Sequence, residues 1–109
     1  VHEGPQAITK NNKIKLQEGM VVSNEPGYYE KNKFGIRIEN LVYVKKENKR
    51  KIFKNFTMVP IDKDLIDLKI MNKNEKNWVN NYHNEVFKNL KNAMSKLEVL
   101  ELKKACSPI

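Results

Sequence analysis

The hydrophobic pattern of this 109-residue chain changes its period after Asp62. Before Asp62, apolar and polar side chains alternate, most clearly over residues 34–46, and a period of two is typical of β-strands. After Asp62, apolar residues recur at every fourth position and place one stripe on a helix face, at Trp78, Tyr82, Val86, Leu90 and Met94. The two patterns predict an α+β chain, with a β part over residues 1–61 and a helical extension over residues 62–109.

The β part contains three segments that we interpret as strands: residues 20–24, 34–46 and 52–61. Pro26 and Gly27 end the first strand. We expect residues 28–33 to form a loop or hairpin connection, and the charged run 47–51 to form a turn. Short connections between consecutive strands predict an antiparallel meander. Because a single sheet must be covered on at least one face, we expect sequence outside this chain to supply that cover.

The helical extension is predicted to contain two helices, the first beginning near Asn74 and Glu75. Ser95 and Glu98 fit a capping box, in which each side chain accepts a hydrogen bond from the other residue's backbone N–H group. This pair predicts the start of a second helix that ends before Pro108. The apolar residues expected on the second helix are Leu97, Leu100 and Ala105.

The composition indicates which classes of partner the chain is expected to lack. Its net charge is +8, but 19 of its 21 basic residues are lysine and 15 residues are asparagine, a bias that an AT-rich genome produces without nucleic-acid binding. We therefore expect no nucleic-acid partner. Apolar runs are shorter than the ~20 residues that span a bilayer, so no membrane partner is expected either. The first residue is Val1, and we expect this to be the C-terminal piece of a longer protein.

We interpret the lone cysteine and one histidine as residues without a catalytic or metal-binding role. Cys106 is the lone cysteine and cannot form an internal disulfide, so we interpret it as a thiol without a chemical role in a reducing compartment. His83 falls within the predicted first helix, and we interpret it as a packed or solvated histidine rather than a metal ligand.

Two glutamates fourteen positions apart carry the chemical information of the β part: Glu25, followed by Pro26-Gly27, and Glu39. Side chains alternate along a strand, so Arg37 and Glu39 are expected on a polar face. Ile36 and Ile38 are expected on the opposite face, in a core. A buried carboxylate is costly unless it is paired, protonated or bound to a cation, which favours a divalent metal. The alternative is a surface strand with a salt bridge, and two glutamates alone are too few for a two-metal site.

The ordered motifs resemble those of a known family. The segments VHEGP at 1–5, GMVVSNEPGYYE at 19–30 and FGIRIEN at 34–40 resemble the end of the catalytic domain of Xaa-Pro aminopeptidases, metallopeptidases of the pita-bread fold. The segments TMVPI at 57–61 and WVNNYH at 78–83 are similar to the tail of their cytosolic, three-domain eukaryotic form. The resemblance implies that residues 1–61 are the C-terminal part of a pita-bread domain and that residues 62–109 are its helical C-terminal extension.

The resemblance also implies the roles of individual residues. The family holds two metal ions, usually manganese, with two aspartates, one histidine and two glutamates. Glu25 and Glu39 would be the two glutamate ligands, and Glu25 would also handle a proton. His2 would lie near the substrate, binding it and acting in catalysis without binding metal. Tyr29 and Arg37 would hydrogen-bond around the ligands. The remaining ligands would lie upstream of Val1, so we expect the isolated chain to be inactive.

The activity implied is that of a hydrolase that releases the N-terminal residue from peptides with proline in second position. The resemblance implies a cytoplasmic homodimer, in which the stripe from Trp78 to Leu90 packs at the junction of the sheet and a neighbouring subunit. Two alternatives stay open. One is a sibling hydrolase of the same fold, such as a prolidase or a methionine aminopeptidase. The other is a non-catalytic pita-bread module that binds proteins.

Overall fold

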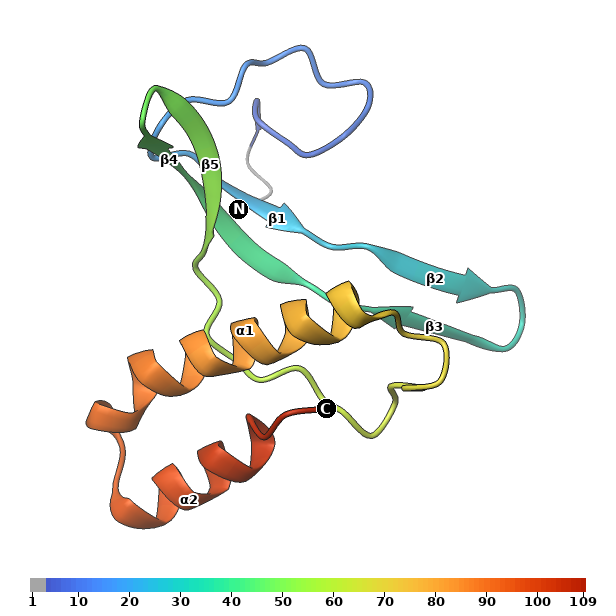
Figure 1. Cartoon of the computed structure of the whole chain (residues 1–109). Helices are drawn as coiled ribbons and strands as arrows, with labels where there is room; N and C mark the ends of the chain where they lie inside the picture. Colours follow the sequence, from blue (N-terminus) through green and yellow to red (C-terminus); the bar gives the residue numbers. More distant parts are fainter. Residues whose placement is uncertain (1–3) are drawn as a thin grey trace. The chain divides into compact units, whose positions relative to one another are not determined.

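The computed structural model describes residues 4–109 (Figure 1). The chain folds into two compact units, one ending at Thr57 and the other comprising Met58–Ile109. Among the described residues, the first unit holds the five β-strands and the second holds the helices. This α+β organisation agrees with the change of hydrophobic period in the sequence.

The first unit is built around a three-stranded antiparallel sheet of β1 (Val21–Asn24), β4 (Asn40–Glu47) and β5 (Arg50–Asn55), in the order β1-β4-β5. Its buried residues lie on one face: Val22, Val42 and Val44, which are 1%, 6% and 2% exposed, and Asn40, which is 8% exposed. β4 and β5 are joined tightly through Asn48 and Lys49, which adopt positive φ angles of 47° and 67° and match the two-residue turns of hairpins. The predicted antiparallel order of the three strands is confirmed, and the turn between the last two is shorter than the predicted turn 47–51.

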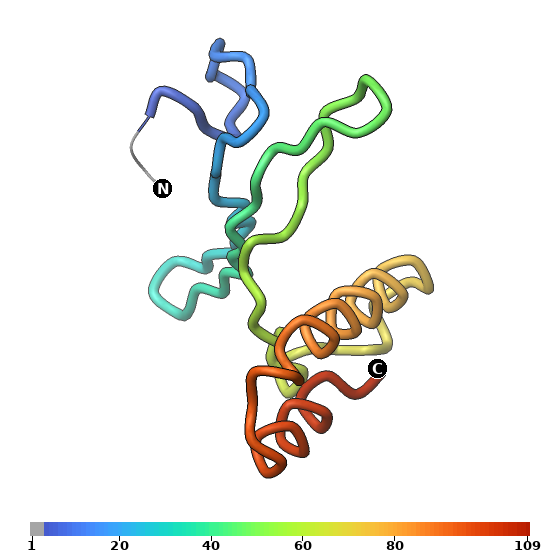
Figure 2. Tube along the Cα trace, turned by 90° about the vertical axis from the view of Figure 1, so that its left-hand side faces the viewer, coloured from blue at the N-terminus to red at the C-terminus, as the bar shows by residue number. Residues whose placement is uncertain are grey.

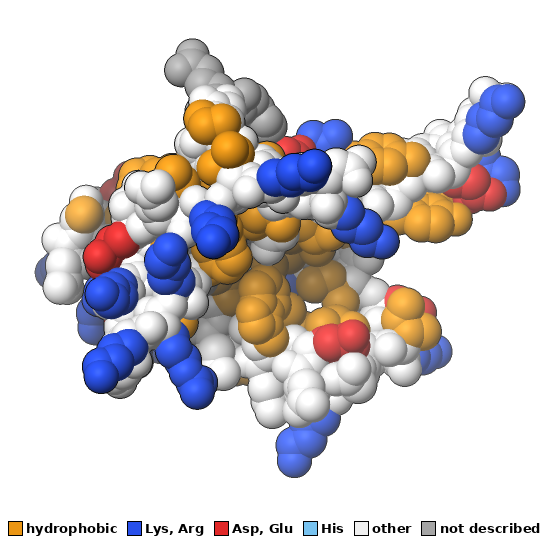
Figure 3. All heavy atoms as spheres, turned by 90° about the horizontal axis from the view of Figure 1, so that it is seen from above, with side chains coloured by type: hydrophobic (Ala, Val, Ile, Leu, Met, Phe, Trp, Pro, Cys, Tyr) orange, Lys and Arg blue, Asp and Glu red, His pale blue; other side chains and the backbone are white. Residues whose placement is uncertain are grey.

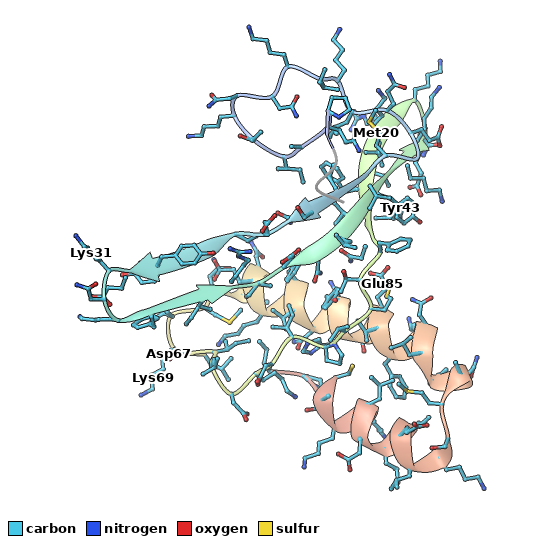
Figure 4. All side chains as sticks on the ribbon, turned by 180° about the vertical axis from the view of Figure 1, so that it is seen from behind. Met20, Lys31, Tyr43, Asp67, Lys69 and Glu85 are labelled. Atoms are coloured by element: carbon cyan, nitrogen blue, oxygen red, sulfur yellow. The ribbon has the colours of Figure 1, made fainter. Side chains whose placement is uncertain are left out.

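A separate hairpin, β2 (Gly27–Glu30) and β3 (Phe34–Arg37), lies in sequence between β1 and β4. Lys31 lies at its tip (Figure 4). The prediction of one continuous strand over residues 34–46 is therefore wrong, and residues 28–30, half of the predicted connection 28–33, are strand. The cause is a change of partner, because β3 pairs with β2 whereas β4 pairs with β1 and β5.

The last predicted strand is also too long, since β5 ends at Asn55 rather than at residue 61. The backbone N–H groups of Phe56 and Thr57 both donate to the Leu41 carbonyl, at 2.8 and 3.3 Å. The Thr57 hydroxyl accepts from the Leu41 N–H group at 2.8 Å. These bonds replace the regular ladder, and Pro60 has no N–H group with which to resume it.

The hairpin leaves an apolar face uncovered within residues 4–109. Tyr28 and Phe34 are 62% and 51% exposed, with ring centroids 6.1 Å apart. Ile36 and Ile38 are 44% and 45% exposed, so the expectation that they fill a core is not met by the described part of the chain. Hydrophobic side chains reach the surface in several places (Figure 3).

The second unit consists of α1 (Lys73–Leu90), a short 3-10 turn η1 (Lys91–Ala93) and α2 (Lys96–Ala105), whose course is traced in Figure 2. The capping box of Ser95 and Glu98 is present as predicted. α1 starts slightly earlier than predicted, because Asn72 and Glu75 form a second capping box. No helix of the described residues is both long and apolar enough to cross a membrane.

The core of the second unit lies between the helices and the segment that precedes α1. Its buried members are Tyr82, Val86, Leu102 and Cys106, against which Met58, Ile61, Phe87 and Leu90 pack. The Tyr82 hydroxyl donates to the Val59 carbonyl at 2.8 Å, and the Ile61 N–H group donates to Nε2 of His83 at 3.1 Å. His83 is fully buried, which agrees with a packed histidine. Burial raises the pKa of the Cys106 thiol, which disfavours the reactive thiolate.

The predicted stripes are partly wrong. Trp78 and Met94 are 53% and 37% exposed, and the buried side of α1 instead carries Val79, Tyr82, His83 and Val86. An α-helix has 3.6 residues per turn, so a spacing of four drifts by about 40° at each step and turns Trp78 away from the buried face. Met94 lies beyond the end of α1 at Leu90, so the helical spacing does not apply to it. In α2, Leu97 and Leu100 are exposed, whereas Leu102 and the C-cap residue Cys106 are buried.

Candidate functional site

The strand pairing brings the two glutamates opposite each other. Asn24 pairs with Asn40 in one ladder, and Gly27 pairs with Arg37 in the next. Two residues on each side separate the ladders, so Glu25 falls opposite Glu39 in register. The Ile38 N–H group donates to the Pro26 carbonyl at 3.1 Å, which holds this junction together. Opposed residues of an antiparallel pair project from the same face, with Cβ atoms about 4.5–5.5 Å apart.

The Glu25 carboxylate is held on both oxygens. The Ser23 hydroxyl donates to Oε1 at 2.8 Å, and Nη1 of Arg37 donates to Oε2 at 3.0 Å. The side chains of Arg37 and Glu25 are 49% and 30% exposed, so this ion pair adds little to folding stability. Each carboxylate oxygen has two lone pairs, and one on each therefore stays available for a further ligand.

Tyr29 and Arg37 continue this network. Nε of Arg37 donates to the Tyr29 hydroxyl at 2.8 Å, and the guanidinium carbon lies 5.9 Å from the centre of the Tyr29 ring. The hydrogen bond with Tyr29 raises the pKa of Arg37, and the charges of Glu25 and Glu39 raise it further. Arg37 is thus a fixed positive charge within electrostatic reach of both glutamates.

A pocket lies beside Glu25 in the first unit. Its volume is about 470 Å³, within the range of about 300–1,000 Å³ for small-molecule sites. It is lined by residues 4–8 on one side and by residues 22–26 on the other. His2, the predicted substrate-binding and catalytic histidine, lies outside the described residues.

The sequence-based picture of the site needs two corrections. Glu39 is not inside an apolar strand, because it lies between β3 and β4 and is exposed. Arg37 pairs with Glu25 across the hairpin, a contact that alternation along one strand cannot reveal. Ser23 was missed altogether, although a hydroxyl two positions before a carboxylate in an extended segment is a visible signal.

The described residues suit part of a metal centre. Two opposed carboxylates supply the oxygen ligands that hard and borderline divalent cations prefer. Within residues 4–109, no group of three or more His, Cys, Asp or Glu side chains could hold a metal ion. Glu25 and Glu39 can therefore contribute two ligands, and a complete site requires further ones.

Two family models match the chain. Residues 1–46 match the model described as metallopeptidase family M24, and residues 52–109 match the model of the C-terminal region of peptidase M24. The second match covers more than half of the chain.

Curated relatives and a solved structure agree with these models. The chain is 46% identical over 98 residues to a probable Xaa-Pro aminopeptidase P of Pyrenophora teres, covering 80% of this chain and 15% of that protein. It is 44% identical over 97 residues to aminopeptidase P2 of Arabidopsis thaliana, covering 80% and 14%. The chain thus spans about one seventh of the length of these relatives.

The solved structure is an X-prolyl aminopeptidase of Caenorhabditis elegans, described as a cytosolic enzyme with a di-nuclear active site. It matches with a TM-score of 0.71 at 36% identity, over 86% of this chain and 17% of that one. This similarity confirms the α+β fold as that of the end of a pita-bread domain with its helical tail. The matched models and the shared fold show that this chain belongs to the M24 metallopeptidases and carries their C-terminal region.

Proposed function

We propose that this chain is the C-terminal part of a two-metal aminopeptidase that releases the N-terminal residue from peptides with proline in second position. The observation that carries the proposal is the register that sets Glu25 opposite Glu39, with Arg37 and Ser23 orienting Glu25. The names of the relatives, which are Xaa-Pro aminopeptidases, support the choice of substrate class.

In this proposal, Glu25 and Glu39 contribute two of the carboxylates that hold the metal pair. When bound, the metals lower the pKa of a water nucleophile and stabilise the oxyanion that develops on the scissile carbonyl. Glu25 accepts the proton of the attacking water, because its carboxylate is oriented by two donors and keeps free lone pairs. Arg37 and Tyr29 keep that carboxylate in place.

His2 is proposed to bind the peptide substrate and to act in catalysis. Residues 4–8, which follow it closely in sequence, line the pocket beside Glu25. This proximity in sequence supports the proposed role. We propose manganese as the metal, since carboxylate-rich sites suit it. A cytoplasmic location is proposed because the solved neighbour is described as cytosolic.

The proposal is tested with Glu25→Gln in the full-length protein, which keeps the shape of the side chain and removes its charge. We expect a loss in kcat of about 10²–10⁴-fold on an X-Pro-Pro tripeptide, typical of a lost proton-transfer group. Glu30→Gln is the matched control, because Glu30 lies five positions after Glu25, at the end of β2, but pairs with Lys33 at the tip of the hairpin. Near-normal turnover of Glu25→Gln with Mn²⁺ present would contradict the proposal.

The same assay separates the alternatives. Cleavage of an X-Pro dipeptide but not of the tripeptide would indicate a prolidase, and removal of an initiator methionine would indicate a methionine aminopeptidase. A full-length protein that binds no metal and cleaves none of these peptides would be a non-catalytic module.

We also propose that the full-length protein is a homodimer in which the exposed part of α1 takes part. Trp78 is 53% exposed and stacks on Tyr82, with ring centroids 5.8 Å apart. Trp78→Asp should shift the protein toward monomer in sedimentation experiments, whereas Leu97→Asp on α2 should not. An unchanged dimer in Trp78→Asp would show that this face is not the interface.

A further inference from the structure

The ring of Tyr29 lies directly on the backbone of two glycines, Gly27 and Gly35, which we name the glycine platform. A β-carbon placed on Gly27 would lie 2.7 Å from the Tyr29 hydroxyl oxygen and 2.9 Å from Cζ. A β-carbon placed on Gly35 would lie 2.6 Å from Cδ1 of the same ring. All three distances are shorter than the contacts that real β-carbons make, so the ring occupies the space that two side chains would fill.

Neither platform glycine is explained by its backbone conformation. The only glycine with a positive φ among residues 4–109 is Gly19. Gly27 and Gly35 lie within strands β2 and β3, where glycine weakens a strand because it has no side chain to pack and loses more entropy on folding. Glycine stands at both positions because any side chain there would take the space of the Tyr29 ring.

The platform determines where the Tyr29 hydroxyl lies. Tyr29 pairs with Gly35 across the hairpin, and its ring extends over Gly27, which pairs with Arg37. The hydroxyl is thereby placed against Arg37, whose Nε donates to it at 2.8 Å while Nη1 donates to Glu25 at 3.0 Å. Three consecutive contacts therefore lead from glycine backbone to ring, from ring to guanidinium and from guanidinium to carboxylate.

The exposed side chains of Tyr29 and Arg37 need the glycine platform to hold them in place. Tyr29 is 61% exposed and the Arg37 side chain is 49% exposed, so neither is fixed by burial in a core. An exposed side chain without shape restriction samples several rotamers, and ordering it costs entropy. Contact with a flat glycine backbone, together with the hydrogen bond to Arg37, restricts the ring on the face that carries Glu25.

We propose that Gly27 and Gly35 are positioning residues of the metal site. They hold Tyr29 so that its hydroxyl orients Arg37, and Arg37 then orients the Glu25 carboxylate for metal binding. The inference rests on the proposed function in one respect, which is that Glu25 is a metal ligand.

The test is a double-mutant cycle of Gly35→Ala and Tyr29→Ala in the full-length protein, with metal affinity measured by chelator competition. Residues that orient a ligand usually contribute 10–100-fold to metal affinity, so each single variant should lose about that factor. Gly35→Ala should cost nothing more once Tyr29→Ala has removed the ring, because the two changes act through one contact. In peptide assays at saturating metal, kcat should fall while KM stays near its original value.

A second pair of variants avoids any change of the backbone. Tyr29→Phe keeps the ring on the platform and removes only the hydroxyl that Arg37 contacts, so it too should lose about 10-fold or more in metal affinity. Tyr28→Phe is its matched control, since Tyr28 lies on the opposite face of the hairpin and should leave metal affinity unchanged.

The outcomes distinguish this inference from the proposed function. If Glu25→Gln leaves metal affinity unchanged, the proposed function itself is wrong. If Glu25→Gln weakens metal binding but Tyr29→Phe does not, the positioning role is overturned while the proposed function stands. Additive losses from Gly35→Ala and Tyr29→Ala in folded protein would also overturn it, because they would show that the glycine acts independently of the ring.

Discussion

Large apolar side chains are buried in the core of the helical unit and exposed in the hairpin β2–β3. In the helical unit, Tyr82, Val86 and Leu102 are 3%, 0% and 7% exposed and form a core. In the hairpin, Tyr28 and Phe34 are 62% and 51% exposed. A two-stranded hairpin is at best marginally stable by itself, because it cannot bury an apolar face. The helical unit therefore has a core but none of the candidate site residues. The hairpin contributes Tyr29 and Arg37 to the site and has ordered polar contacts instead of a core.

The largest effect is expected in the core of the helical unit. Leu102→Ala should lower the local free energy of unfolding by about 2–5 kcal/mol, because it removes packing and leaves a cavity. Hydrogen exchange of α1 and α2 in the full-length protein measures this loss.

Leu97→Ala makes the same chemical change on the same helix and serves as the control. Leu97 is 71% exposed, so its replacement should stay within about 0.5 kcal/mol. Equal losses from the two variants would mean that the helical unit does not bury the face described above.

A pH effect of intermediate size is expected from His83. Burial lowers the pKa of His83, and the positive charge of Lys63 lowers it further. Nε2 accepts from the Ile61 N–H group, so the neutral form is the one that fits. Nδ1, which carries the proton of the neutral ring, is buried without a partner within residues 4–109, and a second proton would have to go to Nε2, where it would break the hydrogen bond from Ile61.

The sign of this effect follows from proton linkage. The unfolded chain binds the proton more readily than the folded one, so the stability from neutral His83 is complete above a pH of about 6.5. It is lost as the pH falls below that value, by up to about 1.4 kcal/mol per pH unit. Hydrogen exchange of α1 at pH 7.5 and 5.5 should show the loss. His83→Gln should abolish this pH dependence, whereas His2→Gln should retain it.

The smallest effect on stability, with a large one on function, is expected in the hairpin. Arg37→Lys keeps the charge but cannot reproduce the planar fork that contacts both Tyr29 and Glu25. Because the pair is exposed, stability should change by less than about 1 kcal/mol, while metal affinity falls by about 10–100-fold.

Arg50→Lys, at the start of β5, replaces the other arginine of the chain and is expected to change neither quantity. Joint measurement of hydrogen exchange and chelator competition tests this separation. A loss of stability in Arg37→Lys as large as in Leu102→Ala would contradict the contrast between the two regions.

Local signals in the sequence predicted local structure well. The capping box at Ser95 and Glu98 and the helical character of the extension follow from short-range hydrogen bonds and periodicity, and both are confirmed. The exposure of Trp78 was not foreseen, because the drift of a four-residue spacing matters only over several turns. The exposure of Met94 was not foreseen because α1 ends at Leu90.

Contacts between strands were harder to predict. The pairing of Arg37 with Glu25 depends on where β2 turns back, and residues 34–46 read as one strand because a change of partner leaves no mark on alternation. The glycine platform was invisible for a similar reason, since it is formed by residues of two strands. Both glutamates were identified through motifs, whereas their opposed register comes from the structure.

The central claim is that Glu25 and Glu39 face each other and hold a metal pair. Anomalous diffraction from crystals of the full-length protein grown with Mn²⁺ tests it directly. We expect two anomalous peaks about 3.5–4 Å apart, contacted by the carboxylates of both residues. Peaks remote from both carboxylates, or Glu25 and Glu39 projecting from opposite faces of the strand pair, would contradict the account.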